Sequence, residues 1–248
     1  MSERKILSGN TLKTIAFISM VIDHVGLVFF PTVIAFRIVG RLAFPIFAFM
    51  ISEGARYTKN RLAYFLRMLI CGILFNAVYY YFTRDTLLSI FFTFSISILT
   101  IYLLEAVKSV FFDPDSGKIK KNVYILLGFL GIVAVVLLTR VVTVDYGFFG
   151  CMLPVFASLF DFRRINAPMN VKAIDRLMFR QFSFTAGVLV LAAHYGGIQY
   201  FSLLALPLVY LYSEERGKRP MKYFFYVAYP LHIAIIYGLR MLIVYLNK

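Results

Sequence analysis

Charged residues are scarce in this chain: only 15% of its 248 residues are Asp, Glu, Lys or Arg, whereas 61% are hydrophobic. A soluble domain of this length cannot bury so much apolar surface. Several apolar runs also approach the length that is needed to cross a bilayer. The composition therefore excludes an ordinary soluble protein and predicts an all-α, polytopic integral membrane helical bundle.

Cysteine is also scarce, and tryptophan is absent. Cys71 and Cys151 both lie inside apolar runs, where we expect reduced packing residues rather than a disulfide. The polar start MSERKILSGNTLK and a first span without a small-residue cleavage site predict that there is no cleavable signal peptide. No internal repeat is visible, so we expect one domain over residues 1–248, without the two-fold pattern of many secondary transporters. We expect no metal.

Acidic residues are outnumbered by basic ones, 12 to 26, and the net charge of +14 is by itself compatible with nucleic-acid binding. The positions of the basic residues along the chain distinguish a nucleic-acid-binding protein from a membrane protein. Apolar runs predict nine membrane spans, at residues 12–30, 33–53, 62–82, 87–107, 123–142, 146–161, 177–194, 198–213 and 223–246.

Basic residues gather at the start of the chain and in every second connection between these spans. They are Arg4, Lys5 and Lys13, then Arg56, Lys59, Arg61 and Arg67, then Lys108, Lys118, Lys120 and Lys121, then Arg163, Arg164, Lys172, Arg176 and Arg180, then Arg216, Lys218, Arg219 and Lys222. The other connections contain only Arg84 and Arg140. By the positive-inside rule this predicts a cytoplasmic N-terminus and an outer C-terminus in the cytoplasmic (inner) membrane, with lipids and no nucleic acid as partners.

Ionisable residues inside the first two spans need an explanation, because each costs at least about 2.5–3.5 kcal/mol at the bilayer centre. The run MVIDHVGLVFF contains Asp23 and His24, and helical geometry places Arg41 of the second span at a similar depth. Arg37 and Arg41 share one helix face. We expect Asp23 to pair with Arg37 or Arg41, with Gly40 allowing a close approach, and His24 to face a cavity. Alternatively, the ion pair only holds the two spans together.

Two further ionisable residues lie in the last span and at the end of the second. His232 lies about 14 Å into the last span, where Pro230 is expected to open the helix. Glu53 ends the second span and is expected either to cap the helix end or to pair with Arg56 or Arg67.

Lys13 and His24 are eleven residues apart, close to three helical turns, and so share one face of the first span. This spacing suits an elongated anionic ligand that enters from the cytoplasm, such as acetyl-CoA. Simple snorkelling of Lys13 to the membrane surface is the alternative.

The segments LKTIAFISMVIDHVG, RIVGRLAFPIFAFMISEGARYTKNRLAYFLRML and KYFFYVAYPLHIAI resemble the TraX family, whose members are described as conjugal-transfer pilin acetylases. That family is in turn similar to the acyltransferase-3 group, which has an Arg/Lys-x10-His pattern on its first helix that Lys13 and His24 match. The resemblance implies that His24 is the catalytic base and Lys13 a coenzyme A contact. The group's Arg-x-x-Arg motif has its nearest counterpart in Arg37 and Arg41, which have three residues between them.

These features predict an integral membrane acetyltransferase that moves an acetyl group from cytoplasmic acetyl-CoA to a peptide or pilin N-terminus, or to a surface glycan hydroxyl. We expect His24, Asp23 and Arg41 to be catalytic, with Arg41 either stabilising the oxyanion or balancing Asp23. We expect the acetyl-CoA site to use a second set, namely Lys13, Arg37, Arg56, Arg61, Arg67 and His232. A proton-coupled transporter that uses Asp23, His24 and Arg41, and a non-catalytic assembly subunit, are the alternatives.

Overall fold

A computed structural model describes residues 6–217 and 221–247. Arg4, Lys5, Lys218 and Arg219, which the predicted charge pattern includes, lie outside the described residues, as does the side chain of Lys222. In the described part the chain is helical, without strands beyond two isolated bridges. The elements are α1 (Gly9–Phe29), α2 (Ile34–Gly40), α3 (Ala43–Tyr57), α4 (Arg61–Thr83), α5 (Ile90–Phe112), α6 (Lys118–Val141), α7 (Gly147–Ser158), α8 (Met169–Lys172), α9 (Leu177–Tyr195), η1 (Gly197–Ala205), α10 (Leu206–Tyr210) and α11 (Lys222–Leu246).

Seven helical stretches of the described chain are long and apolar enough to cross a membrane, which confirms the predicted polytopic all-α class. The two remaining predicted spans coincide with shorter elements, α7 and the pair η1–α10. Twelve residues of α-helix reach only about 18 Å. The 3₁₀ geometry of η1 rises about 2.0 Å per residue, so η1 and α10 together reach about 25 Å. The count of nine spans stays a prediction.

The chain forms two compact units. Unit 1 contains residues 1–50, 70–86 and 188–248, and unit 2 contains residues 51–69 and 87–187. Helices α3, α4 and α9 each begin in one unit and end in the other. The units are therefore not consecutive segments of the sequence, and a single domain stays our prediction.

Unit 1 is built on α1, which packs against α2 and α11. Ser8 caps the start of α1, because its hydroxyl accepts a hydrogen bond from the N–H of Thr11 at 3.2 Å. Pro31 follows the end of the helix, where it prevents continuation. A side chain at Gly26 would collide with Phe36 of α2, so glycine allows these helices to approach closely.

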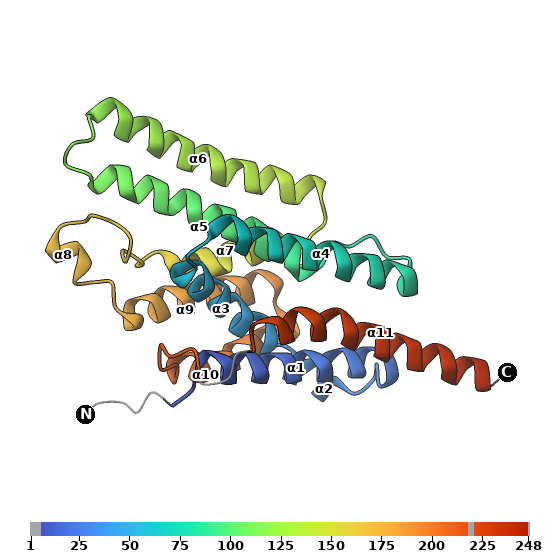
Figure 1. Ribbon diagram of the computed structural model, residues 1–248. Coiled ribbons are helices and arrows are strands. Elements are labelled where there is room, and N and C mark those ends of the chain that lie inside the picture. Colours follow the sequence, from blue (N-terminus) through green and yellow to red (C-terminus); the bar gives the residue numbers. More distant parts are fainter. Residues whose placement is uncertain (1–5, 218–220, 248) are drawn as a thin grey trace. The chain divides into compact units, whose positions relative to one another are not determined.

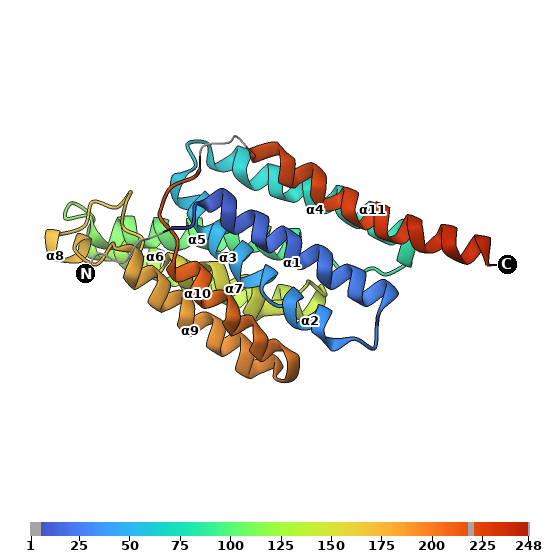
Figure 2. The same cartoon turned by 90° about the horizontal axis from the view of Figure 1, so that it is seen from below.

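Helices α1 and α11 lie side by side and run in the same direction in both views (Figures 1 and 2). Two parallel helices that both cross a membrane start on the same side of it. This arrangement agrees with a topology whose two termini lie on opposite sides. Which side is cytoplasmic stays a prediction from the charge pattern.

Unit 2 is centred on α5, which packs against α6 and α7. Gly131 of α6 faces Leu103 of α5 so closely that a Cβ would collide, a small-residue contact that is common between membrane helices. The hydroxyl of Ser97 is buried and donates to the carbonyl of Cys151 at 2.7 Å. Cys71 and Cys151 are both free and buried, as expected from the sequence.

Candidate active site

The helix of the predicted second span is locally distorted at Arg41, whose φ and ψ stay helical and whose N–H still bonds to the carbonyl of Arg37 at 3.2 Å. Helix α2 ends at Gly40, and α3 begins only at Ala43. Pro45 has no backbone N–H, so the carbonyl of Arg41, four residues earlier, loses its helical donor. Irregular backbone at membrane depth is tolerated where it is buried in protein or lines a cavity. Arg41 therefore lies at a distorted turn of the helix, and its side-chain contacts show whether it belongs to a polar site.

Asp23 of α1 pairs with both arginines of α2. Its carboxylate lies 2.9 Å from Nη1 of Arg37 and 3.2 Å from Nη2 of Arg41. The side chains of Asp23 and Arg41 are only 15% and 12% exposed, whereas Arg37 is 30% exposed. A Cβ at Gly40 would collide with Asp23. The predicted pairing and the role of Gly40 are confirmed, and two guanidinium groups on one carboxylate leave one positive charge in excess.

His24 points to another part of unit 1, as expected for the neighbour of Asp23 on a helix. Its Nδ1 lies 3.0 Å from the carbonyl oxygen of Met20 and 3.3 Å from Nε2 of His232. A carbonyl oxygen only accepts hydrogen bonds, so the hydrogen of a neutral His24 belongs on Nδ1. Nε2 of His24 then keeps its lone pair. A cavity at Nε2 stays a prediction.

His232 comes from α11 and is held by aromatic neighbours. Its ring makes edge contacts with Phe17 and Tyr229, with centroid distances of 5.9 and 5.4 Å, and the residue is 6% exposed. Helix α11 continues through Pro230, so the expected opening of the helix at this proline is wrong. Packing against fixed rings, and not a break in the helix, positions His232 beside His24.

Gln199 is a member of this cluster that the sequence reasoning missed. It lies in η1, is 4% exposed, and its Oε1 accepts a hydrogen bond from Nη1 of Arg41 at 3.4 Å. The only signal available was one amide in the apolar run that begins with IQYFSLLAL. Without the contact to Arg41, 158 positions earlier, that signal cannot be told from a polar residue at a helix end.

Lys13 lies on α1 at the predicted spacing from His24. Because α1 is unbroken from Gly9 to Phe29, the two side chains share a face about 16 Å apart. The structure therefore keeps the predicted spacing of Lys13 and His24, and a path for a ligand along α1 stays a prediction. The contact with coenzyme A stays a prediction.

The other arginines expected at the acetyl-CoA site belong to unit 2. Arg56 pairs with Asp161 and, at 2.8 Å, with Asp175. Arg61 pairs with Glu105 and lies over the ring of Tyr102. The side chains of Arg56 and Arg61 are thus engaged with acidic and aromatic groups of unit 2. Arg67 is also in this unit, and its Nε is buried without a hydrogen-bond partner in the described chain.

The predicted partners of Glu53 were wrong. The structure pairs Glu53 with Arg180, and both side chains are nearly inaccessible, at 5% and 2% exposure. The charge pattern places Arg180 among the cytoplasmic basic residues, yet it is one of the largest fully buried side chains. A charge of that burial needs a partner, and Arg56 is already occupied by two aspartates.

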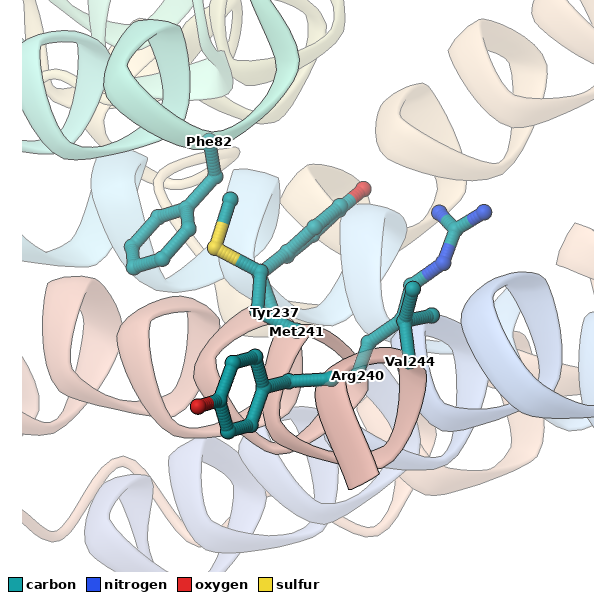
Figure 3. Close-up of a pocket in the computed structure, with 6 residues that line it drawn as sticks. Phe82, Tyr237, Arg240, Met241 and Val244 are labelled. Atoms are coloured by element: carbon teal, nitrogen blue, oxygen red, sulfur yellow. The ribbon is translucent and has the colours of Figure 1, made fainter. Parts of the chain in front are cut away.

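A separate cavity of about 310 Å³ lies at the far end of α11 (Figure 3). Phe82 comes from α4, and the remaining lining residues Tyr237, Arg240, Met241, Val244 and Tyr245 come from α11. His24, Asp23 and Arg41 do not line it. Among the described residues, no group of three His, Cys, Asp or Glu side chains is placed to hold a metal ion.

The cluster of unit 1 thus combines four elements of base-assisted chemistry. These are an imidazole with a free lone pair, a second imidazole that fixes it, a carboxylate and an excess of positive charge. Such a set can accept a proton at His24 and stabilise negative charge near Arg41.

Comparison with known proteins shows which family the chain is similar to. The family model described as TraX protein matches residues 8–240, which include every residue of the cluster. An uncharacterized protein of Rickettsia prowazekii (strain Madrid E) is 35% identical over 74 residues, which are 30% of this chain and 28% of that relative. The matched part of the chain thus spans less than a third of that relative's length. No solved structure matches the chain.

Proposed function

The chain belongs to the TraX family, and from this membership and the His24 cluster we propose that it is an integral membrane acetyltransferase with acetyl-CoA as the donor. The acceptor is a hydroxyl or amine of a glycan or of a peptide such as a pilin N-terminus. A thioester supplies an already activated acetyl group. The protein therefore has to provide a base for the acceptor, a positive group for the developing oxyanion and a site that excludes water.

The observation that carries the proposal is the set of contacts at His24. Nδ1 is engaged by the carbonyl of Met20 at 3.0 Å and by Nε2 of His232 at 3.3 Å. With the hydrogen of neutral His24 on Nδ1, facing the carbonyl of Met20, Nε2 is the nitrogen that accepts a proton in this proposal. A general base in this position contributes about 10²–10⁴ in rate.

In the proposed step, Nε2 of His24 takes the proton from the acceptor O–H or N–H while the acceptor's electron pair forms a bond to the acetyl carbon. The carbonyl π electrons move to oxygen, and Arg41 stabilises that oxyanion. When the carbonyl re-forms, the C–S bond breaks with its electrons on sulfur. His24 then returns its proton to the departing thiolate, which leaves as the thiol of coenzyme A.

Asp23 and Arg37 set the charge around this step. Asp23 is shared between both arginines, and the three side chains together carry one net positive charge. One excess positive charge in a partly buried site favours an anionic donor and a developing oxyanion. A site with equal numbers of positive and negative groups would not favour an anionic donor or an oxyanion in this way.

We assign Lys13 to the phosphates of the donor, because it lies on the same face of the continuous helix α1 as His24. Arg37 and His232 act inside the cluster. Arg56 and Arg61 hold carboxylates of unit 2, so we no longer assign them to the donor. Arg67 stays a prediction.

Transfer of labelled acetyl from acetyl-CoA tests the proposal. The purified full chain in nanodiscs is incubated with acetyl-CoA and simple hydroxyl and amine acceptors, and release of free coenzyme A is measured. Release that depends on both the acceptor and His24 supports the proposal. Release that is the same without protein contradicts it.

A proton-coupled transporter is the second candidate, because hydrogen-bonded imidazoles such as His24 and His232 also suit a proton relay. Proton uptake into proteoliposomes separates the two. Uptake driven by a pH gradient, together with no acyl transfer, favours the transporter.

A further inference from the structure

Gln199 is held in an unusual local structure. It follows two glycines with positive φ, Gly196 at 63° and Gly197 at 52°, which turn the chain from α9 into η1. Its N–H donates to the carbonyl of Gly196 at 3.0 Å. A side chain at either glycine position would be strained in this conformation. The turn therefore fixes the start of η1 and with it the position of the buried Gln199 side chain.

The contact with Arg41 determines which way the Gln199 amide points. A guanidinium group has only donors, so the atom of the amide that faces Arg41 is the oxygen. Nε2 therefore points elsewhere, and it is buried without a hydrogen-bond partner in the described part of the chain. Leaving such a donor unsatisfied is costly, which favours a ligand atom at this position.

Ser202 provides a second observation on the same helix. Positions three apart coincide on a 3₁₀ helix, so Gln199 and Ser202 lie on one face of η1. Ser202 is 0% exposed, and its hydroxyl also lacks a hydrogen-bond partner among the described residues. This face thus holds two buried polar groups that the described protein does not satisfy, and Gln199 is in contact with Arg41.

We infer that Gln199 is a catalytic residue, whose Nε2–H donates to the acetyl carbonyl oxygen as that oxygen becomes negative. The inference rests on the proposed acetyl transfer. Arg41 supplies charge to the oxyanion, and Gln199 supplies a neutral, directed donor. The hydrogen bond from Arg41 to Oε1 fixes the amide in this orientation. Two donors that converge on one oxygen are the usual arrangement for stabilising a tetrahedral intermediate.

The alternative is that Gln199 only holds Arg41 in place. The two roles require different atoms of the same amide: holding Arg41 needs the oxygen, whereas binding the oxyanion needs the nitrogen. Gln199→Glu keeps an oxygen for Arg41 and removes the donor. Gln199→Met removes both at similar size and without adding charge. Tyr200→Phe, on the exposed neighbouring residue, is the control.

The experiment measures three quantities for each variant in nanodiscs. These are turnover with acetyl-CoA, the melting temperature, and the Kd of coenzyme A and of S-carboxymethyl coenzyme A, which places a carboxylate close to the position of the acetyl oxygen. We expect Gln199→Glu and Gln199→Met to lose about 10²–10³ in turnover. We expect both to bind coenzyme A like the wild type, but to bind the carboxymethyl compound about tenfold more weakly or worse. Gln199→Glu should keep the melting temperature.

Near-wild-type turnover in Gln199→Glu overturns the inference, because it leaves Gln199 with a structural role alone. Equal weakening of both ligands in Gln199→Met overturns it in the same way. These results leave the proposed function intact, since the wild type is active in them. A wild type that transfers no acetyl group overturns the proposed function and the inference with it.

Discussion

Nε2 of His232 lies 3.3 Å from Nδ1 of His24, and this contact joins α11, near the end of the chain, to α1 at its start. The same Nδ1 lies 3.0 Å from the carbonyl of Met20. Because the carbonyl can only accept, His24 donates and His232 accepts. His232 therefore contacts the proposed base at Nδ1, whereas Nε2 of His24 is the nitrogen that faces the acceptor in the proposed step.

The role of His232 as a hydrogen-bond acceptor predicts graded effects on turnover. His232→Phe keeps the packing against Phe17 and Tyr229 but removes the acceptor. We expect turnover to fall roughly two- to tenfold, which corresponds to about 0.5–1.5 kcal/mol for one net hydrogen bond. His232→Gln offers an amide oxygen and should lie between that variant and the wild type. Steady-state acetyl transfer, with melting temperature as the control for folding, measures this. A larger loss of turnover in His232→Gln than in His232→Phe would contradict the role of His232 as an acceptor.

The charge cluster predicts that Asp23 matters more for stability than Arg37. Asp23→Asn leaves two guanidinium groups together without their carboxylate, a loss of up to about 3–5 kcal/mol for a buried pair. Arg37→Gln leaves Asp23 paired with Arg41, and Arg37 is partly exposed, so the loss should be about 0–1 kcal/mol. Thermal unfolding in detergent gives both values. Equal destabilisation by the two substitutions would show that Arg41 does not balance Asp23.

A double substitution separates the two roles considered for Arg41. Asp23→Asn with Arg41→Gln should fold better than Asp23→Asn alone, because an absent pair is tolerated better than a lone buried charge. Its turnover should still be about 10²–10³ lower than that of the wild type, because the oxyanion has lost its positive group. The test is a double-mutant cycle that is read for both melting temperature and acetyl transfer. Near-wild-type transfer in the stable double variant would reduce Arg41 to a counter-ion.

Glu53 and Arg180 give a test of unit 2 that is independent of catalysis. Either Glu53→Gln or Arg180→Gln leaves a charge that is almost fully buried, so each should destabilise by about 3–5 kcal/mol. The double variant should recover part of this loss. Arg67→Gln is the matched control and should show no coupling with Glu53→Gln. Coupling of Glu53 with Arg67 and not with Arg180 in these melting experiments would favour the original sequence-based pairing.

Cysteine labelling tests the topology, including the short helix α7. Exposed positions in four connections suit the experiment: Asp85, Asp115, Thr143 and Asn170. The nine-span topology predicts that cysteines at Asp85 and Thr143 react with an impermeant maleimide in intact cells. Cysteines at Asp115 and Asn170 should react only after permeabilisation.

Labelling of Asn170→Cys in intact cells would show that α7 does not cross the membrane. Asp115 is preferred to its neighbour Ser116, which is 7% exposed and whose hydroxyl donates to Asp113. Cys71 and Cys151 are buried, and the wild type should therefore give low background.

The pairing of Asp23 with Arg37 and Arg41 could be predicted from the sequence because it depends on simple rules. Charged residues in apolar runs need partners, adjacent spans connected by a short loop lie next to each other, and depth follows from the helical rise. The role of Gly40 could be predicted as well, because a glycine beside an expected ion pair allows the two spans to approach closely. The segments that form the membrane helices were recognisable for a similar reason, since their apolar length is a local property.

The features that were missed depend on contacts between distant parts of the chain. Gln199 meets Arg41, and Glu53 meets Arg180, across 158 and 127 positions. No periodicity or spacing encodes such pairs. The distortion at Arg41 differs from these pairs, because it has a local signal in Pro45, which removes a backbone donor and favours a kink, whereas α11 continues through Pro230.

The central claim, that His24 is the base of an acetyl transfer, is tested most directly by comparing His24→Ala with Lys13→Ala in one assay. Acetyl transfer from acetyl-CoA and calorimetric binding of coenzyme A are measured on the same nanodisc samples. We expect His24→Ala to bind coenzyme A like the wild type and to lose about 10²–10⁴ in turnover, while Lys13→Ala binds more weakly. Full turnover in a folded His24→Ala protein would contradict the account.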